Sequence, residues 1–482
     1  MRSIKLARFV AASVLLFVIG NAVSAQDTAP ASRPKHRRYK FIDLGTFGGP
    51  DSIIPFLQPV LTKQGTVIGI AETDIPDPFA PLCASPNCKV QRGFEWRKGV
   101  MTQLPGLSAL GESAAQAIND SGTVVGDSEE GLIDPVSGLP EINAVRWRNG
   151  EIEDLGTLGG NSSGALSVSK SGLVTGWSET DIVDSSGETV VRAFLWKNGV
   201  MHDLGSLGGP VSFGQDVNEH GQVVGFSFLD STTVHPFFWE NGHMTDLSLG
   251  GTQGGSGLVN SRGQAIGDST LPGDVEDHAF FWSQGKLYDL GTLGGTKSLP
   301  TGLNENGHVS GMSRTTNNET LHAVLWRNRK INDLGTVPGD ACSFAWGLNS
   351  KDQVVGISLP DPCDFSVAHA FLWDRGSMVD LNTLIPHDAG LTLVYGEAIN
   401  DAGEIVGIGV PPGVSPADVE VLGHAYVLIP EEDTFDSEGE SVQTTNESVG
   451  NSAVPANADK FEDRMVRRIR EQQLRKLHLS KQ

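Results

Sequence analysis

Acidic side chains gather in three stretches of the N-terminal half of the chain, each between two short apolar runs. Carboxylates are the ligands that hard cations such as calcium prefer, and a pair of them can supply the acid and the base that cleave a glycosidic bond. No stretch has the full spacing of a calcium-binding hand motif, so calcium is an alternative to plain solvated loops. The candidate binding residues are Glu72, Asp74, Asp77, Glu129, Glu130, Asp134, Glu179, Asp181 and Asp184.

No motif in the sequence defines an active site by itself. The chain has no HExxH helix and no phosphate-cradling glycine loop. We therefore expect a binding module more than an enzyme, and we assign no catalytic residue, no metal ligand and no cofactor. The alternative is a carbohydrate-active enzyme, a glycoside hydrolase or lyase, that assembles its carboxylates from the same acidic stretches.

A repeated unit positions these residues. Its clearest copy, His278 to Gly311, joins an HAFFW run, a DLG run, an LGTLGG loop and a small-residue run that ends in an Asn-x-x-Gly turn. The apolar residues alternate with a period of two, which indicates strands. Because Asn and Gly tolerate positive φ, the Asn-x-x-Gly segments are predicted to be hairpin turns. The four predicted strands of a unit are clearest at 299–304, 307–313, 278–282 and 286–291.

The marks of this unit recur along residues 41–430. The leucines of the DLG-type runs are Leu44, Leu104, Leu155, Leu204, Leu247, Leu290, Leu334 and Leu381. The tryptophans of the HAF-type runs are Trp96, Trp147, Trp196, Trp239, Trp282, Trp326 and Trp373. The β-branched runs close at Gly69, Gly126, Gly176, Gly225, Gly267, Gly311, Gly356 and Gly407.

The two ends of the repeat region are complementary halves. The chain begins with a DLG-type strand, Tyr39–Gly45, that has no HAF-type strand before it. It ends with an HAF-type strand, Gly423–Pro430, that has no DLG-type strand after it. Propellers of four-stranded blades close their ring by pairing such halves. The sequence therefore predicts an all-β fold, a β-propeller of eight blades whose last blade is closed by the N-terminal strand. An open β-solenoid with a capping repeat at each end is the alternative.

Three of the motifs together are typical of one repeat family: HAFLW at 369–373, DLGTLGG at 154–160 and INDAGEIVG at 399–407. On these motifs the chain resembles the bacterial extracellular HAF repeat family, named for its His-Ala-Phe motif, over nearly all of residues 41–430. The resemblance implies an exported repeat protein and supplies no activity and no catalytic residue. The early repeats depart from the pattern, because GFEW and NAVRW replace the HAF-type run and QLPGL replaces DLG.

Segments of different composition flank the repeats. Residues 1–25 are predicted to be a secretory signal peptide, with an uncleaved anchor as the alternative. Residues 26–40 are predicted to be a disordered basic arm, 431–458 an acidic flexible linker, and 459–482 a short basic amphipathic helix. For this helix, contact with an anionic surface or a partner, docking on the propeller, and a solvated tail all stay open.

Export makes disulfides the expected use of the four cysteines. Cys83 and Cys88 lie close together in CASPNC, and Cys342 and Cys363 bracket one predicted hairpin. We predict a disulfide within each pair, with free buried thiols as the alternative. We expect the mature protein to be secreted, periplasmic or at the cell surface, without a transmembrane span.

Charge and loop placement bound the class of partner. The chain has a net charge of −23, and residues 41–430 alone carry about −27, which argues against nucleic acid. The longer connections of each unit share one face, where function is more often found. We therefore expect a binding or scaffold module that contacts an extracellular or envelope protein or a glycan through acidic loops. The Asp, His and Trp that recur in most units are expected to be structural.

Overall fold

The computed structural model describes residues 36–435, apart from 81–82, 84, 110, 135–137 and 186. The chain divides into two units between Pro34 and Lys35, and every described residue belongs to the second unit. The predicted signal peptide and C-terminal helix lie outside the described residues, as do most of the predicted arm and linker. Among the described residues, no helix is both long and apolar enough to span a membrane.

Four-stranded antiparallel sheets make up the described part, as the sequence predicted. Sheet 1 contains β2 (Gly48–Ile53), β3 (Val67–Pro76), β4 (Lys89–Arg97) and β5 (Val100–Gln103). Sheet 2 contains β6 (Ser113–Ile118), β7 (Val124–Ile133), β8 (Pro140–Arg148) and β9 (Glu151–Asp154). Sheet 3 contains β10 (Gly159–Val168), β11 (Val174–Val183), β12 (Thr189–Lys197) and β13 (Val200–Asp203). Sheet 4 contains β14 (Ser212–Val217), β15 (Val223–Phe228), β16 (Val234–Glu240) and β17 (His243–Asp246).

The later repeats form sheets of the same order. Sheet 5 contains β18 (Gly254–Val259), β19 (Ala265–Thr270), β20 (Asp277–Ser283) and β21 (Lys286–Asp289). Sheet 6 contains β22 (Gly294–Leu303), β23 (Val309–Thr315), β24 (Leu321–Arg327) and β25 (Lys330–Gly335), and one parallel pair, Asp277 with Lys297, links it to sheet 5. Sheet 7 contains β26 (Asp340–Leu348), β27 (Val354–Pro360), β28 (His369–Asp374) and β29 (Ser377–Asp380). The described helices are short: α1 (Val419–Leu422) and the 3-10 turns η1 (Thr316–Asn318), η2 (Leu381–Leu384) and η3 (Pro416–Asp418).

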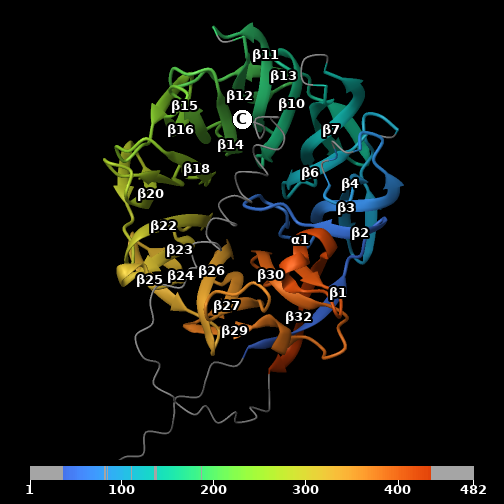
Figure 1. The fold of residues 1–482 in the computed structure, drawn as a ribbon, viewed down its shortest axis with the longest axis vertical. Helices are drawn as coiled ribbons and strands as arrows, with labels where there is room; N and C mark the ends of the chain where they lie inside the picture. The colour runs from blue at the N-terminus through green and yellow to red at the C-terminus, as the bar shows by residue number, and fades with distance from the viewer. Residues whose placement is uncertain are drawn as a thin grey trace, which may run out of the picture. The chain divides into compact units, whose positions relative to one another are not determined.

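Sheet 8 joins the two ends of the described chain. It contains β30 (Thr392–Ile399), β31 (Ile405–Val410) and β32 (His424–Phe435), and β1 (Arg37–Asp43) pairs antiparallel with β32. Figure 1 shows β1 in blue beside β32 in orange-red. β1 thus begins inside the range predicted to be a disordered arm, and β32 continues beyond Pro430 into the predicted linker. The motifs did not mark these ends because the two strands extend each other by backbone pairing, out to Arg37 opposite Phe435.

The sheets follow one another around a common centre, with the first strand of each sheet innermost (Figure 1). Each first strand contacts the preceding sheet, as β6 contacts β3, and β2 contacts β31 and β32 in the same way. Large side chains fill the space between sheets. Trp326 is fully buried between sheets 5 and 6 and donates its indole N–H to the Leu290 carbonyl at 3.0 Å. The structural role predicted for the repeated tryptophans is confirmed at this position.

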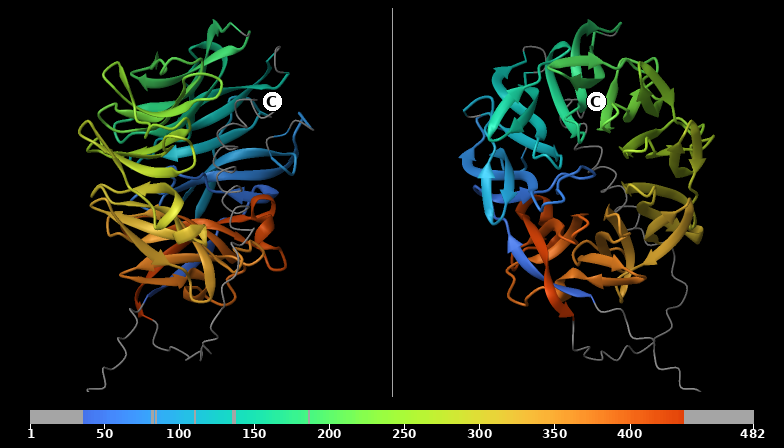
Figure 2. Two further views of the ribbon diagram at one scale, coloured as in Figure 1. Left: turned by 60° about the vertical axis from the view of Figure 1, so that its left-hand side comes forward. Right: turned by 180° about the vertical axis from the view of Figure 1, so that it is seen from behind.

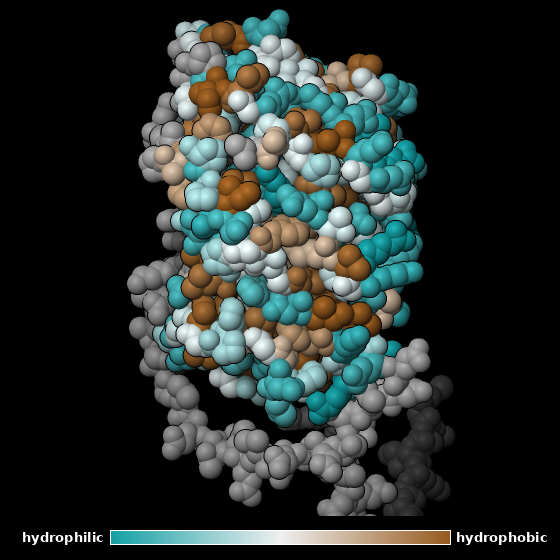
Figure 3. All heavy atoms as spheres, turned by 90° about the vertical axis from the view of Figure 1, so that its right-hand side faces the viewer, coloured by the Kyte–Doolittle hydropathy of each residue, from teal (hydrophilic) through white to brown (hydrophobic). Residues whose placement is uncertain are grey.

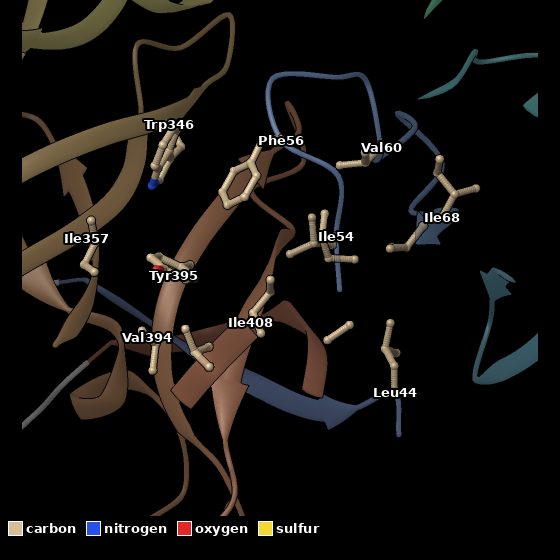
Figure 4. Close-up of a cluster of buried hydrophobic side chains, with 14 of the residues drawn as sticks. Leu44, Ile54, Phe56, Val60, Ile68, Trp346, Ile357, Val394, Tyr395 and Ile408 are labelled. Carbon is tan, nitrogen blue, oxygen red and sulfur yellow. The ribbon is translucent and has the colours of Figure 1, made fainter. Parts of the chain in front are cut away.

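The connection between β2 and β3 brings sheet 1 against sheets 7 and 8. Phe56 packs on Trp346 of β26, with ring centroids 5.0 Å apart, and on Tyr395 of β30, with centroids 6.2 Å apart. Ile54 and Val60 are buried in the same cluster (Figure 4). This apolar contact adds side-chain packing to the backbone pairing that holds the two ends of the described chain together.

The Asn-x-x-Gly turns use their asparagine differently from the prediction. In 304–307 only Gly307 has a positive φ, 78°. Asn304 instead accepts hydrogen bonds at Oδ1 from the N–H groups of Asn306 and His308, both at 3.0 Å. Its amide donates to the Asn349 carbonyl of sheet 7, also at 3.0 Å. The same bond to the next sheet is donated by Asn119, Asn218, Asn260, Asn349 and Asn400.

Candidate functional site

The second strand is longer in sheets 1 to 3 than in the other sheets, and we call the hairpins that it forms with the third strand the long hairpins. β3, β7 and β11 have 10 residues each, whereas β15, β19 and β31 have 6 and β23 and β27 have 7. The pairing of these strands is interrupted by a shift in register, and such a bulge bends a strand and increases its twist. Figure 2 (left) shows the hairpins of these first sheets, in blue, teal and green, projecting on one side. In each of them the register shifts after a glutamate: between Glu72 and Pro76, Glu129 and Ile133, and Glu179 and Val183.

Glu72 is enclosed by the protein rather than presented to solvent. Its side chain is fully buried and accepts hydrogen bonds from the Ser85 hydroxyl and, at 3.1 Å, from the Asn87 amide. That amide also donates to the Val421 carbonyl of α1 at 2.9 Å. Glu72 therefore holds the hairpin of sheet 1 against the region of sheet 8, which is a structural role.

A second carboxylate group lies where sheets 1 and 2 meet. Glu129 Oε2 accepts a hydrogen bond from the Glu112 N–H at 2.8 Å, and both residues are nearly buried. Arg92 of β4 is also buried, and its guanidinium donates to carbonyls of the segment that leads into β6, those of Gly111 and, at 3.0 Å, Ala109. Sequence reasoning predicted Glu129 for this site and missed Glu112 and Arg92.

The charges of this group act on one another. Burial raises the pKa of Glu112 to about 8, and repulsion from Glu129 and Asp77 contributes, while a hydrogen bond from the Gln91 N–H opposes it. Burial also raises the pKa of Glu129. Asp77 is itself buried and accepts a hydrogen bond from the Phe79 N–H at 2.8 Å. The structure thus brings Asp77 of sheet 1 close to Glu129 of sheet 2, which are far apart in the sequence.

The contact between sheets 2 and 3 repeats this arrangement. Glu179 Oε2 accepts hydrogen bonds from the N–H groups of Asn161 and Ser162, both at 3.1 Å. The Asn161 amide donates to Asp134, a nearly buried carboxylate, at 3.3 Å. Burial raises the pKa of Glu179, and Asp134 adds to the shift. Asp134 and Glu179 are therefore brought together, and both are engaged by the protein.

Glu130 is tied to the outer part of sheet 2. It accepts a hydrogen bond from the Asn143 amide, which also donates to Asp154 at 3.1 Å. Burial raises the pKa of Glu130, and the neighbouring Asp154 raises it further. This network again serves the sheet itself.

Only part of the predicted acidic set faces solvent. Asp74 and Asp181 are exposed, and Asp184 is half-buried, with Oδ1 accepting a hydrogen bond from the Glu188 N–H at 3.0 Å. Asp74 and Asp181 lie within strands β3 and β11, not in loops as predicted. These two carboxylates stand on the hairpins of sheets 1 and 3, on either side of the hairpin of sheet 2, and are accessible to a partner.

Exposed aliphatic side chains accompany these carboxylates, and sequence reasoning missed them. Five are exposed on the three long hairpins: Ile75, Leu132, Ile133, Ile182 and Val183. The signal was present in the repeated patterns DIPD, GLID and DIVD, in which apolar residues occupy a segment taken to be a polar loop. Figure 3 views the molecule from the right-hand side of Figure 1, where sheets 1 and 2 lie, and shows hydrophobic residues in brown scattered among hydrophilic ones in teal. We name the tips the hairpin surface, formed by Asp74, Ile75, Leu132, Ile133, Asp181, Ile182 and Val183.

The repeated histidines have a structural role. His278 Nδ1 lies 2.9 Å from Asp289 of the adjacent strand, and His322 Nδ1 lies 3.0 Å from Asp333. The same Asp also accepts a backbone N–H, as Asp289 accepts that of Gly291 at 2.7 Å. The hydrogen bond that His278 donates to Asp289 raises the pKa of His278. The structural role expected for the recurring Asp residues is confirmed here, and their pairing with His is an additional contact.

Both predicted disulfides are present. Cys83 pairs with Cys88, with Cα atoms 5.2 Å apart, and Cys342 pairs with Cys363, with Cα atoms 5.5 Å apart. The first pair lies in the long hairpin of sheet 1. The second ties β26 to the residues that follow β27, and Cys342 lies inside β26 rather than before it.

Within the described residues, no three His, Cys, Asp or Glu side chains are grouped so that they could hold a metal ion. A cavity of about 230 Å³ lies at the turns of sheets 6 and 7, away from the hairpin surface. Its Asp352 is already engaged by Arg327 at 2.7 Å and by His308 at 2.8 Å.

No family model and no curated protein sequence matches the chain. Among solved structures it is similar to the β-propeller domain of the Trilobed protease from Pyrococcus furiosus, with 11% identity over 68% of this chain and 98% of that chain and a TM-score of 0.37. It is also similar to a puromycin-hydrolyzing peptidase of Mycobacterium tuberculosis, with 13% identity, coverage of 79% and 62%, and a TM-score of 0.42. A prolyl endopeptidase is similar as well, with 10% identity over 79% of this chain and 55% of that chain and a TM-score of 0.46. The chain spans less than two thirds of the length of these last two proteins.

Proposed function

We propose that this chain is an exported binding module, in which a propeller-like scaffold presents the hairpin surface to an extracellular or envelope protein. The observation that carries the proposal is the exposure of aliphatic side chains on three neighbouring hairpins. Of the nine large apolar side chains that are exposed in the described residues, five belong to this surface. Clustered apolar side chains in contact with water are a mark of protein–protein contact surfaces.

The hairpin surface combines apolar contact with negative charge. Leu132 is 56% exposed and Ile182 is 55% exposed, and the exposed carboxylates of Asp74 and Asp181 stand beside them on the neighbouring tips. Apolar burial supplies affinity, while rim charges steer association and select partners. The surface therefore suits a protein partner whose contact patch is apolar and rimmed by Lys or Arg.

The proposal includes the finer architecture and the family. Eight blades, closed by the pairing of β1 with β32, give the hairpins a rigid base, and the contacts of β2 with β31 and β32 support this closure. Membership in the HAF repeat family rests on the HAFLW, DLGTLGG and INDAGEIVG motifs. The two disulfides support an extracellular or periplasmic location.

A glycoside hydrolase or lyase is the second candidate, because Glu112 has the raised pKa that a general acid needs and lies beside Glu129. Both carboxylates are nearly buried and accept backbone hydrogen bonds, which favours a structural role. Turnover of a polysaccharide by the native chain that is lost in both Glu112→Gln and Glu129→Gln would establish the enzyme. Absence of turnover on a broad glycan panel would reject it.

The binding function is tested by capture from the envelope fraction of the producing cell. The test variant is Leu132→Ser combined with Ile182→Ser and Val183→Ser. The matched control is Val100→Ser with Val200→Ser, since these valines are 62% and 52% exposed but lie at the turns on the other end of the sheets. We expect at least a tenfold loss of one captured protein in the test variant alone. Equal capture by both variants would refute the hairpin surface as the binding site.

A further inference from the structure

Residues 459–482 have the chemistry that the hairpin surface would bind. They hold eight Lys and Arg residues against four Asp and Glu residues, a net charge of +4. Phe461, Met465 and Ile469 follow one another at four-residue spacing. In a helix this spacing places apolar side chains on one face with basic side chains beside them.

The hairpin surface is complementary in both respects. Its aliphatic tips, Leu132, Ile182 and Val183, are each more than half exposed. Exposed carboxylates stand near them at Asp74 and Asp181. Removing both apolar sets from water favours contact, and the opposite charges align the segment on the tips.

The chain is long enough to make this contact. β32 ends at Phe435 in sheet 8, and sheet 8 contacts sheet 1 through β2. The end of β32 lies on the side of the turns, because Leu428 pairs with Ile405 just after the turn between β30 and β31. The hairpin surface is on the other side, and a strand of ten residues such as β7 spans about 33 Å. Residues 436–458 reach up to about 75 Å when extended, which exceeds the thickness to be crossed.

We propose that residues 459–482 of the same chain occupy the hairpin surface until a partner displaces them. The inference rests on the proposed function, because it takes the hairpin surface to be a binding site and names its resident occupant. A tether of this length gives its end an effective concentration of the order of millimolar, so even weak contact suffices. The tail then shields the exposed aliphatic side chains and selects for partners that bind more tightly than it does.

The test is zero-length carbodiimide cross-linking of the full mature chain, which joins an amine to a carboxylate only when the two form an ion pair. A mixture of equal parts of ¹⁴N- and ¹⁵N-labelled chains distinguishes links within one chain from links between copies. We expect isotopically unmixed links from Lys460 or Lys476 to Asp74, Asp181 or Glu188. Their yield should fall at least fivefold in Arg464→Gln/Arg467→Gln/Arg468→Gln, which keeps these lysines, and also between roughly 50 mM and 500 mM salt. Val100→Ser/Val200→Ser serves as the control that leaves the yield unchanged.

Other outcomes overturn the inference. Links that mix isotopes would make a second copy the occupant, and links confined to the acidic residues of 431–458 would keep the tail away from the hairpins. If these links are absent while envelope capture still depends on Leu132, Ile182 and Val183, only the resident-tail inference fails. If capture is also indifferent to those residues, the proposed function fails with it.

Discussion

Sheets 1 to 3 and sheets 4 to 8 are built from one repeat, yet they differ in the polar residue near the start of the third strand and in the hydrogen bonds that this residue makes. Sheets 4 to 8 hold a histidine at the start of the third strand, and four of these histidines bind the Asp of the neighbouring fourth strand: His235, His278, His322 and His424. His369 instead binds Asp340 at 2.9 Å. Sheets 1 to 3 hold Arg92, Asn143 and Arg192 at that position.

The replacements change what the third strand contacts. Arg192 donates to the Pro210 carbonyl at 2.6 Å, in the segment that leads into sheet 4, as Arg92 does for the segment that leads into sheet 2. In these first sheets the strands also continue past a bulge into long hairpins. The comparison teaches that the repeat keeps its fold when the histidine of the third strand is replaced by Arg or Asn. The first three sheets, which have these replacements, are also the ones that form the hairpin surface.

The largest expected contrast lies between the core and the hairpin tips. Phe280→Ala removes a fully buried ring and should lower the free energy of unfolding by about 3–5 kcal/mol. Ile182→Ser changes a side chain that is 55% exposed and should alter it by less than about 0.5 kcal/mol. Denaturant unfolding of both variants gives the comparison. A large loss for Ile182→Ser would mean that the tips are packed, against the assignment of a surface role.

The buried carboxylates of sheets 1 and 2 should make stability depend on pH. Because the folded pKa of Glu112 is about 8, above its ordinary value of 4.5, the folded state keeps a proton that the unfolded state releases, and stability falls as pH rises through this range. Glu112→Gln should remove that fall and stabilise the protein by about 1–2 kcal/mol at pH 8, with little change at pH 4. Melting curves across pH would show it. A variant less stable than the native chain at pH 8 would show that the ionised carboxylate is favourable.

His278 and His369, whose pKa values are raised by hydrogen bonds to Asp289 and Asp340, should give a smaller dependence of the same sign. The hydrogen bond that His278 donates to Asp289 raises the pKa of His278, so the contribution of this pair to stability is full below pH 6.5 and is lost as pH rises through the folded pKa. His278→Gln should cost no more than about 1 kcal/mol at pH 5.5 and less at pH 9, because the pair lies near solvent. Arg192→Gln, at the equivalent non-titrating position, is the control. A pH-independent cost would exclude the charged pair.

The smallest effect concerns the asparagine bonds between sheets. Sheet 3 has Ser169 at this position, whose hydroxyl accepts the Leu173 N–H at 2.9 Å, and no bond from its side chain to sheet 4 is seen among the described residues. Ser169→Asn should add that bond and stabilise by about 0.5 kcal/mol, whereas Asn260→Ser should lose it and cost about 1 kcal/mol. Thermal unfolding of the pair measures the difference. If both variants changed the stability in the same direction and by the same amount, the conformation of the turn, and not the hydrogen bond between sheets, would account for the effect.

Local patterns were enough to predict much of the architecture. The period of two in the apolar residues predicted the strands. The half-units at Tyr39–Gly45 and Gly423–Pro430 predicted the pairing of β1 with β32. The short spacing of the cysteines within each pair predicted both disulfides. These features depend on residues that are close in sequence or on the repeat itself. The ends of β1 and β32 were misplaced because pairing there continues beyond the motifs.

The site depended on contacts between repeats. Nothing in the sequence links Asp77 with Glu112, or Asp134 with Glu179, because burial of a carboxylate is decided by the neighbouring sheet that covers it. The same packing buried four of the nine predicted acidic residues, Glu72, Asp77, Glu129 and Asp134, and left Leu132, Ile182 and Val183 in water. The sequence by itself thus determined the repeat, its strands and its closing halves, since these follow from local periodicity. Only the tertiary structure decided which side chains of the hairpins are exposed, since exposure is set by the bulges and by the packing of adjacent sheets.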